Sequence, residues 1–73
     1  MSQHELKTYI EDAIDEHTID SILEEDSGFF AIIDNHGNEV MVYRDLHYGF
    51  DVLSETYSAS YSEGGKLIEW GLQ

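Results

Sequence analysis

The first part of the chain carries apolar side chains at helical spacing. Apolar residues recur every three or four positions at Leu6, Tyr9, Ile10, Ala13 and Ile14, which predicts a helix over residues 3–16. Ser2 followed by Glu5 fits a capping box, which places the helix start just after Ser2. The period then slips, because the next apolar residue after Ile14 is Ile19. We therefore expect a break around residues 16–18, Thr18 as the next N-cap, and a short second helix ending near Glu25.

After residue 27 the pattern becomes that of strands. The run from Phe29 to Ile33 is continuously apolar, is too short for a helix, and is typical of a strand covered on both faces. Residues 35–38 have turn chemistry, and residues 39–43 alternate in the manner of a strand. The pattern predicts an antiparallel hairpin in which residues 29–34 pair with 39–44.

Residues 45–62 have two readings. Apolar residues at Leu46, Phe50, Leu53 and Tyr57 have helical spacing, and Gly64-Gly65 would end a helix well, so a helix is slightly favoured. However, Tyr57 to Tyr61 alternates like a strand, and its serines and tyrosines are poor helix formers. Residues 66–72 predict a final strand in either case.

The expected fold class is α+β, within a single domain spanning residues 1–73. An N-terminal acidic helix or helix pair (residues 1–26) would pack on a three- to four-stranded, mainly antiparallel sheet (residues 27–73). A chain of 73 residues has only a thin core, since a domain of this size buries about 60% of the surface that the unfolded chain exposes.

Charge changes the functional picture. Sixteen acidic residues against three basic ones give a net charge of −13. Such a chain lacks the Lys and Arg needed to neutralise phosphates, so direct binding to nucleic acid or to an anionic membrane is not expected. No basic and apolar leader follows Met1 and no apolar run approaches membrane-spanning length, so we expect a cytoplasmic protein.

Catalytic and metal-binding patterns are missing from the sequence. There is no cysteine, and the four histidines are scattered. Residues 34–39 resemble a calcium loop only superficially, because Gly37 comes fourth rather than sixth, and a hairpin turn explains them better. The serines lack a glycine-flanked elbow, and the carboxylates lie mostly opposite the apolar stripe, where they would be solvated. We expect no enzymatic activity, no cofactor and no specific metal site.

The acidic residues of the helical segment are the strongest functional signal. Like charges three or four positions apart, such as Glu11 with Asp15 and Asp12 with Glu16, each destabilise a helix by roughly 0.2–0.5 kcal/mol. Almost no lysine relieves this repulsion, although alternating signs would give the same solubility. Solubility alone is the simpler explanation, but a concentrated negative face is also what binding to a basic partner requires. The candidate partner-binding residues are Glu11, Asp12, Asp15, Glu16, Asp20, Glu24, Glu25 and Asp26.

In size, acidity, lack of cysteine and α+β pattern, the chain resembles the small acidic phage-encoded inhibitors that mimic DNA, of the anti-restriction and anti-CRISPR kind. The resemblance covers composition and no motif, so no residue roles carry over from it. It implies a basic nucleic-acid-binding partner, such as a nuclease, a restriction enzyme or a CRISPR effector subunit. The acidic helices would block the partner's basic groove, in the cytoplasm of the host cell.

A different class of function rests on the aromatic residues of the second half. Tyr and Trp are enriched at interface hot spots, and this half contains Tyr43, Tyr48, Tyr57, Tyr61 and Trp70. They would suit a small homo-oligomeric or adaptor module, although they would equally complete a thin core. A monomer and a homodimer are both compatible with the sequence.

Overall fold

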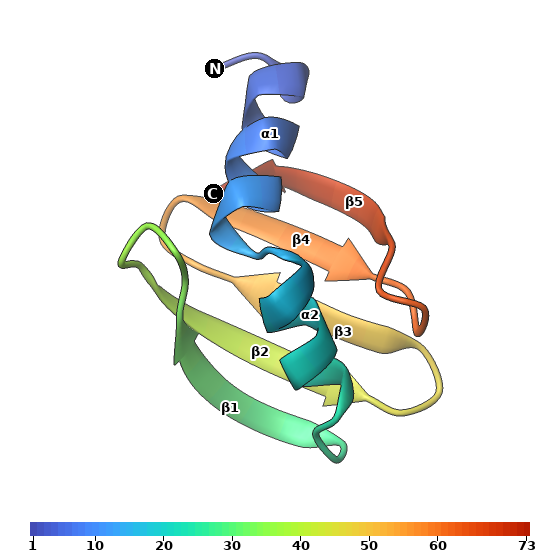
Figure 1. Ribbon diagram of the computed structural model, residues 1–73. Helices are drawn as coiled ribbons and strands as arrows, with labels where there is room; N and C mark the ends of the chain where they lie inside the picture. The colour runs from blue at the N-terminus through green and yellow to red at the C-terminus, as the bar shows by residue number, and fades with distance from the viewer.

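The computed structural model describes residues 1–73 and has two helices lying across one face of a five-stranded sheet (Figure 1). The helices are α1 (Gln3–Ala13) and α2 (Glu16–Leu23). The strands are β1 (Gly28–Ile33), β2 (Glu39–Asp45), β3 (Gly49–Leu53), β4 (Tyr57–Tyr61) and β5 (Leu67–Leu72). Each strand pairs antiparallel with the next, in the spatial order β1-β2-β3-β4-β5. The α+β fold with N-terminal helices is as predicted, with one strand more than the expected three to four.

The two helices are separated earlier than predicted. Ser2 caps α1 as expected, because its hydroxyl accepts a hydrogen bond from the Glu5 N–H at 3.1 Å. However, α1 ends at Ala13, and the N-cap of α2 is Asp15 rather than Thr18. The Asp15 carboxylate accepts from both the backbone N–H and the hydroxyl of Thr18, at 3.0 and 2.9 Å. Asp is as good an N-cap as Thr or better, and Thr18 occupies the third helical position, where its N–H needs an acceptor.

Strands β1 and β2 form the predicted antiparallel hairpin. Phe29 lies opposite Tyr43 and Ile33 opposite Glu39, so Asp34 belongs to the connecting loop rather than to the strand. The Asp34 carboxylate shapes the turn by accepting from the N–H groups of His36 and Asn38, at 2.9 and 2.8 Å. The expectation that β1 is covered on both faces is wrong. This strand lies at the edge of a sheet with helices on one face only, so Phe29 is 73% exposed and Ile33 is 65% exposed.

Residues 45–62 form strands β3 and β4, so the slightly favoured helix is wrong. Phe50 and Val52 are buried beneath the helices while Leu53 faces the other way, which is the alternation of a strand. Gly49 has a φ of +122°, and a Cβ there would overlap the backbone at Tyr61, the last residue of β4, and at Ser62. The apparent helical spacing was therefore a coincidence, because residues from both sides of a strand were counted as one stripe.

The core lies between the helices and the inner face of the sheet. The helices contribute Leu6, Ile10, Ala13, Ile14 and Ile22. The sheet contributes Val40, Val42, Phe50, Val52, Tyr57, Ala59 and Tyr61. Two of the five aromatic residues considered for an interface, Tyr57 and Tyr61, are thus buried parts of this core.

Arg44 ties the end of α2 to the sheet from inside the core. It lies on β2, is only 2% exposed, and donates to the backbone carbonyls of Leu23, Asp45 and Gly49 at 3.1, 2.8 and 2.9 Å. Its guanidinium also forms a two-pronged contact with the Glu63 carboxylate, at 3.1 and 3.3 Å. The positive charge lies at the C-terminal end of α2, where the helix dipole favours a cation.

Candidate partner-binding surfaces

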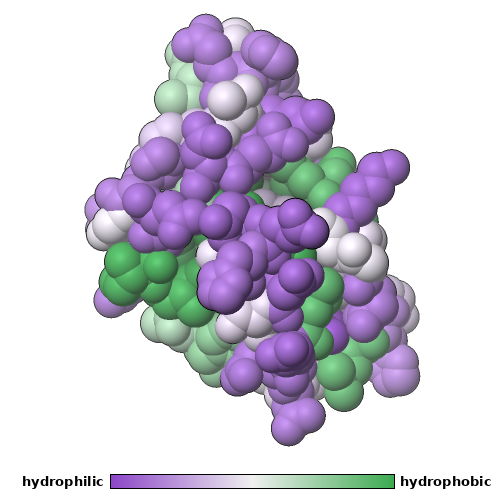
Figure 2. All heavy atoms as spheres, viewed as in Figure 1, coloured by the Kyte–Doolittle hydropathy of each residue, from purple (hydrophilic) through white to green (hydrophobic).

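All eight predicted acidic residues are exposed. They run from the last turn of α1, through the junction and α2, to the segment that leads into β1. We call these eight residues the acidic surface. Figure 2 shows that the helical side of the molecule is covered by a nearly continuous hydrophilic surface, with apolar residues visible mainly at its margins. The structure therefore keeps the predicted carboxylates on one side of the sheet.

No member of the acidic surface has a basic partner. The single ion pair of the molecule joins Arg44 to Glu63. Of the two other basic side chains, Lys7 lies 5.8 Å from the centre of the Trp70 ring, and Lys66 precedes β5. The negative charge of the helical side is consequently not compensated by internal ion pairs.

Asp15 differs from the other seven acids because it has a structural role. The hydrogen bond from the Thr18 backbone, followed by that from the Thr18 hydroxyl, holds the pKa of Asp15 below its ordinary value. It remains a negative charge on the surface, but replacing it also removes the cap of α2. Sequence reasoning missed this role by assigning the cap to Thr18.

The C-terminal end of α1 is held in place by the β1–β2 turn. Asn35 donates from its side chain to the Asp12 carbonyl and from its backbone to the Ala13 carbonyl, at 3.1 and 3.0 Å. His36 stacks on Tyr9 with 4.3 Å between ring centroids. The helix turn that carries Glu11 and Asp12 is therefore anchored to the sheet, which limits the conformational freedom that binding would remove.

Four of the eight acids surround a groove between the α1–α2 junction and the β4–β5 turn. We call it the acidic groove; its volume is about 380 Å³, and its carboxylates are those of Glu11, Asp15, Glu16 and Asp20. The rest of its lining is formed by Ile14, Ile19, Tyr61, Gly64, Gly65 and Leu67. Asp12, Glu24, Glu25 and Asp26 lie outside this groove.

Glycine allows the β4–β5 turn to form one wall of the acidic groove. Gly65 has a φ of +83°, and a Cβ at this position would lie 2.8 Å from Ile19 of α2. The turn therefore approaches the helix more closely than another residue would permit. Sequence reasoning had assigned Gly64-Gly65 to the end of a helix and so did not connect it with α2.

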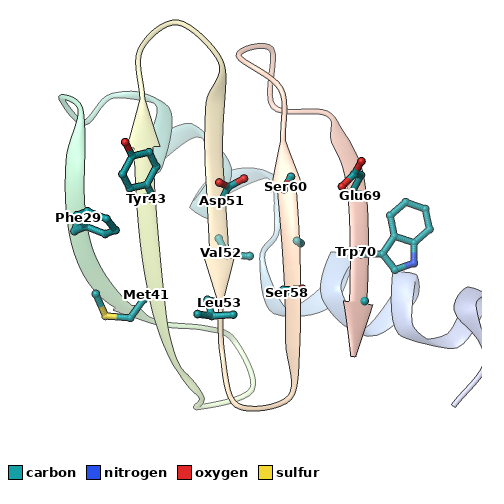
Figure 3. A pocket seen from close by; sticks show the side chains of 12 residues that line it. Phe29, Met41, Tyr43, Asp51, Val52, Leu53, Ser58, Ser60, Glu69 and Trp70 are labelled. Atoms are coloured by element: carbon teal, nitrogen blue, oxygen red, sulfur yellow. The ribbon is translucent and has the colours of Figure 1, made fainter. Parts of the chain in front are cut away.

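The opposite face of the sheet has no helix over it. We call it the open face, and an apolar patch occupies its β1–β3 half, formed by Phe29, Ala31, Ile33, Met41, Tyr43 and Leu53. Polar residues occupy the β4–β5 half and the adjoining part of β3: Asp51, Ser60 and Glu69 lie side by side, and Ser58 lies next to Leu53 (Figure 3). A shallow groove of about 450 Å³ crosses both halves. This patch was missed because the sequence did not reveal that only one face of β1 is covered.

The five aromatic residues of the second half do not form one surface. Tyr43 is 41% exposed on the apolar patch, and Tyr48 is 79% exposed in the β2–β3 turn. Tyr57 and Tyr61 are buried, whereas Trp70 is half-buried and donates from its indole N–H to the Gln3 carbonyl at 3.3 Å. Of these five, only Tyr43 lies on the apolar patch, where its ring packs against that of Phe29 with 4.5 Å between centroids.

Asp34 is the one buried carboxylate, and its contacts are structural. Burial by itself would raise its pKa, but hydrogen bonds from Asn38, Tyr57 and His36 outweigh burial and hold the pKa of Asp34 below its ordinary value. The Tyr57 hydroxyl donates to it at 2.8 Å, and burial followed by this bond raises the pKa of Tyr57. The carboxylate thus joins the β1–β2 turn to β4.

Neither a metal centre nor a membrane span is evident. No three histidine or acidic side chains are grouped so that they could hold one metal ion. Neither helix has the length and apolar character needed to cross a bilayer.

No protein-family model, curated protein or solved structure matches this chain.

Proposed function

We propose that this protein is a non-catalytic inhibitor that uses its acidic surface to occupy the basic groove of a nucleic-acid-binding protein. The observation that carries the proposal is the placement of eight exposed carboxylates, none with a basic partner, on one side of a small anchored scaffold. Neighbouring positions on a helix surface are about 5–6 Å apart, a spacing similar to that of successive backbone phosphates. A partner that neutralises phosphates with Lys and Arg would meet a comparable row of charges here.

The partner class is a DNA- or RNA-binding defence protein, such as a nuclease, a restriction enzyme or a CRISPR effector subunit in the host cytoplasm. This choice follows the compositional resemblance to phage-encoded DNA mimics together with the charge pattern. The proposed contact between the acidic surface and a basic groove is electrostatic. The complex should therefore weaken steeply with ionic strength, because the Debye length falls to about 3 Å at 1 M salt.

The decisive experiment compares two triple variants of equal charge. One replaces Glu11, Asp12 and Asp20 of the acidic surface by Lys. Asp15 is left intact because it caps α2, and each replacement changes the charge by two, so the net charge goes from −13 to −7 (−13 + 6). The matched control replaces three exposed acids elsewhere by Lys, namely Glu39, Glu55 and Glu69. Glu63 is not suitable as a control because it pairs with Arg44.

Tagged wild-type protein is used as bait in lysate across a salt gradient, and each retained protein is then purified and tested for binding to labelled duplex DNA or RNA. We expect a retained nucleic-acid-binding protein whose nucleic acid is displaced by the wild type and by the control triple, but not by the acidic-surface triple. The proposal is wrong if saturating wild-type protein leaves nucleic-acid binding unchanged. It is also wrong if both triples displace equally well.

A second candidate function rests on the apolar patch of the open face. Large exposed apolar patches on small proteins mark interaction sites, and Phe29, Ile33 and Leu53 are each more than half exposed. The occupant we favour is a second copy of this chain. The patch lies on the side of the sheet opposite the acidic surface, so two copies packed patch to patch would keep their negative helical sides outermost. A two-fold arrangement would then bring each patch against its equivalent.

The oligomeric state tests this second candidate. Sedimentation at increasing concentration should show a dimer that high salt does not dissociate and that Leu53→Lys converts to a monomer. Glu55→Lys, on the neighbouring β3–β4 turn, is the matched control and should remain dimeric. A wild type that stays monomeric at high concentration and high salt would exclude the dimer, without affecting the inhibitor proposal.

A further inference from the structure

Tyr61 carries a buried hydroxyl that has no hydrogen-bond partner. The residue is 3% exposed, its ring stacks on Phe50 with 4.5 Å between centroids, and no protein atom satisfies its oxygen. Buried hydroxyl groups are nearly always paired, so an unpaired one indicates a missing partner. The residue lines the acidic groove, and burial, followed by the nearby Glu11 carboxylate, raises the pKa of this hydroxyl. The hydroxyl therefore stays protonated in the same region as the groove's negative charge.

We propose that the acidic groove binds an arginine side chain of the partner, with the Tyr61 hydroxyl and the surrounding carboxylates accepting hydrogen bonds from its guanidinium group. This inference rests on the proposed function, because the arginine would be one of those that normally contact phosphate. Beyond the proposed function, it names the acidic groove as the place where this protein recognises a single basic side chain.

The lining of the groove matches the two parts of an arginine side chain. The methylene stem needs an apolar surface, which Ile14, Ile19 and Leu67 provide. The guanidinium head needs several acceptors in different directions, and the groove is lined by Glu11 and Asp20 as well as Tyr61, with Glu11 close enough to raise the pKa of the Tyr61 hydroxyl. Guanidinium has five N–H donors in a planar fork, so it can serve a hydroxyl and carboxylates together.

Other cations fit this site less well. A metal ion requires several ligands around one point, and no three acidic or histidine side chains are arranged in that way. A lysine ammonium is a compact charge with three donors that is more strongly hydrated than guanidinium, so leaving water to contact a buried hydroxyl would cost it more. The unpaired Tyr61 oxygen is thus the feature that selects arginine over lysine.

The test uses two short capped peptides, acetyl-Gly-Arg-Gly-amide and acetyl-Gly-Lys-Gly-amide, titrated into the isotopically labelled protein. We expect the arginine peptide to bind more tightly and to shift the Tyr61 ring signals and the amides of Gly64 and Gly65. Tyr61→Phe should weaken arginine binding by about threefold to tenfold, the value of one hydrogen bond, and leave lysine binding unchanged. Tyr48→Phe removes an exposed hydroxyl outside the groove and should change neither affinity.

Stability provides a second readout. Because the Tyr61 hydroxyl has no internal partner, Tyr61→Phe should fold with at least wild-type stability. A marked destabilisation would mean that the hydroxyl is satisfied within the protein, and the proposal would fail. Equal binding of the two peptides, or an arginine affinity unchanged in Tyr61→Phe, would also overturn it.

The outcomes separate this inference from the proposed function. If Tyr61→Phe still displaces nucleic acid from the partner as the wild type does, and the peptides are not distinguished, the inhibitor proposal stands and the arginine site falls. If the arginine peptide binds as expected but the acidic-surface triple still displaces nucleic acid, the arginine site is supported and the inhibitor proposal is wrong.

Discussion

Replacing Arg44 by Met tests whether a buried cation holds the two layers together. The methionine would fill much of the same space, but three backbone carbonyls, those of Leu23, Asp45 and Gly49, would lose their donor. Buried ion pairs can often be replaced by apolar residues when both partners are changed. Backbone carbonyls cannot be changed in this way, so their loss of hydrogen bonding remains.

The expected loss in the free energy of unfolding is about 3–5 kcal/mol. Each buried acceptor left without a partner costs about 1–3 kcal/mol, and three carbonyls are affected here. A chain of 73 residues has a total stability of about 4–11 kcal/mol, so the variant would lose a large share of it. Glu63→Gln is the matched control. The Gln amide oxygen can still accept from the Arg44 guanidinium, which also keeps its three carbonyl acceptors, so the loss should stay below about 1 kcal/mol.

Urea titration followed by circular dichroism measures both variants. We expect a lower midpoint for Arg44→Met, with an unchanged slope, and a midpoint close to wild type for Glu63→Gln. If Arg44→Met does not fold, Arg44→Lys provides an intermediate case, because an ammonium keeps the charge but has fewer donors. A loss below about 1 kcal/mol for Arg44→Met would refute the reasoning, as would wild-type stability of Arg44→Lys.

Three further predictions concern the buried polar contacts and the turns. The lowered pKa of Asp34 means that its carboxylate stabilises the fold above the unfolded value of about 4. The stability advantage of wild type over Asp34→Asn should therefore be constant at neutral pH and shrink as the pH falls below about 4, as urea titrations across pH would measure. The pKa values of Tyr57 and Tyr61 are raised in the folded protein, so the free energy of unfolding should fall as the pH rises above about 10. The tyrosinate absorbance of these two residues should therefore develop only as the circular dichroism signal is lost. Gly49→Ala should fail to fold or lose several kcal/mol in thermal or urea unfolding, because its Cβ would overlap the backbone at Tyr61. Gly37 also has a positive φ but has open space around it, so Gly37→Ala should lose only about 1–2 kcal/mol. Equal losses in the two variants would show that no steric overlap occurs at residue 49.

The sequence by itself determined the elements whose signal is local. The stripe from Leu6 to Ile14 required one covered face, and the serine at position 2 placed the start of α1 correctly. The turn residues at 35–38 likewise located the first hairpin, because asparagine and glycine favour turn conformations. The exposure of all eight acids also followed from the sequence, since charged side chains opposite an apolar stripe remain in water.

Tertiary structure decided what depends on contacts between distant segments. The choice of strand over helix for residues 45–62 came from pairing with β2 and β5, which local propensity does not contain. Whether β1 is covered on one face or two depended on where the helices lie, and that left Phe29 and Ile33 exposed. The acidic groove needs Glu11, Tyr61 and Gly65 together, and these residues meet only because the β4–β5 turn packs against α2. Whether the buried Tyr61 hydroxyl finds a hydrogen-bond partner depends on this packing, so the sequence pattern alone does not reveal that it is unpaired.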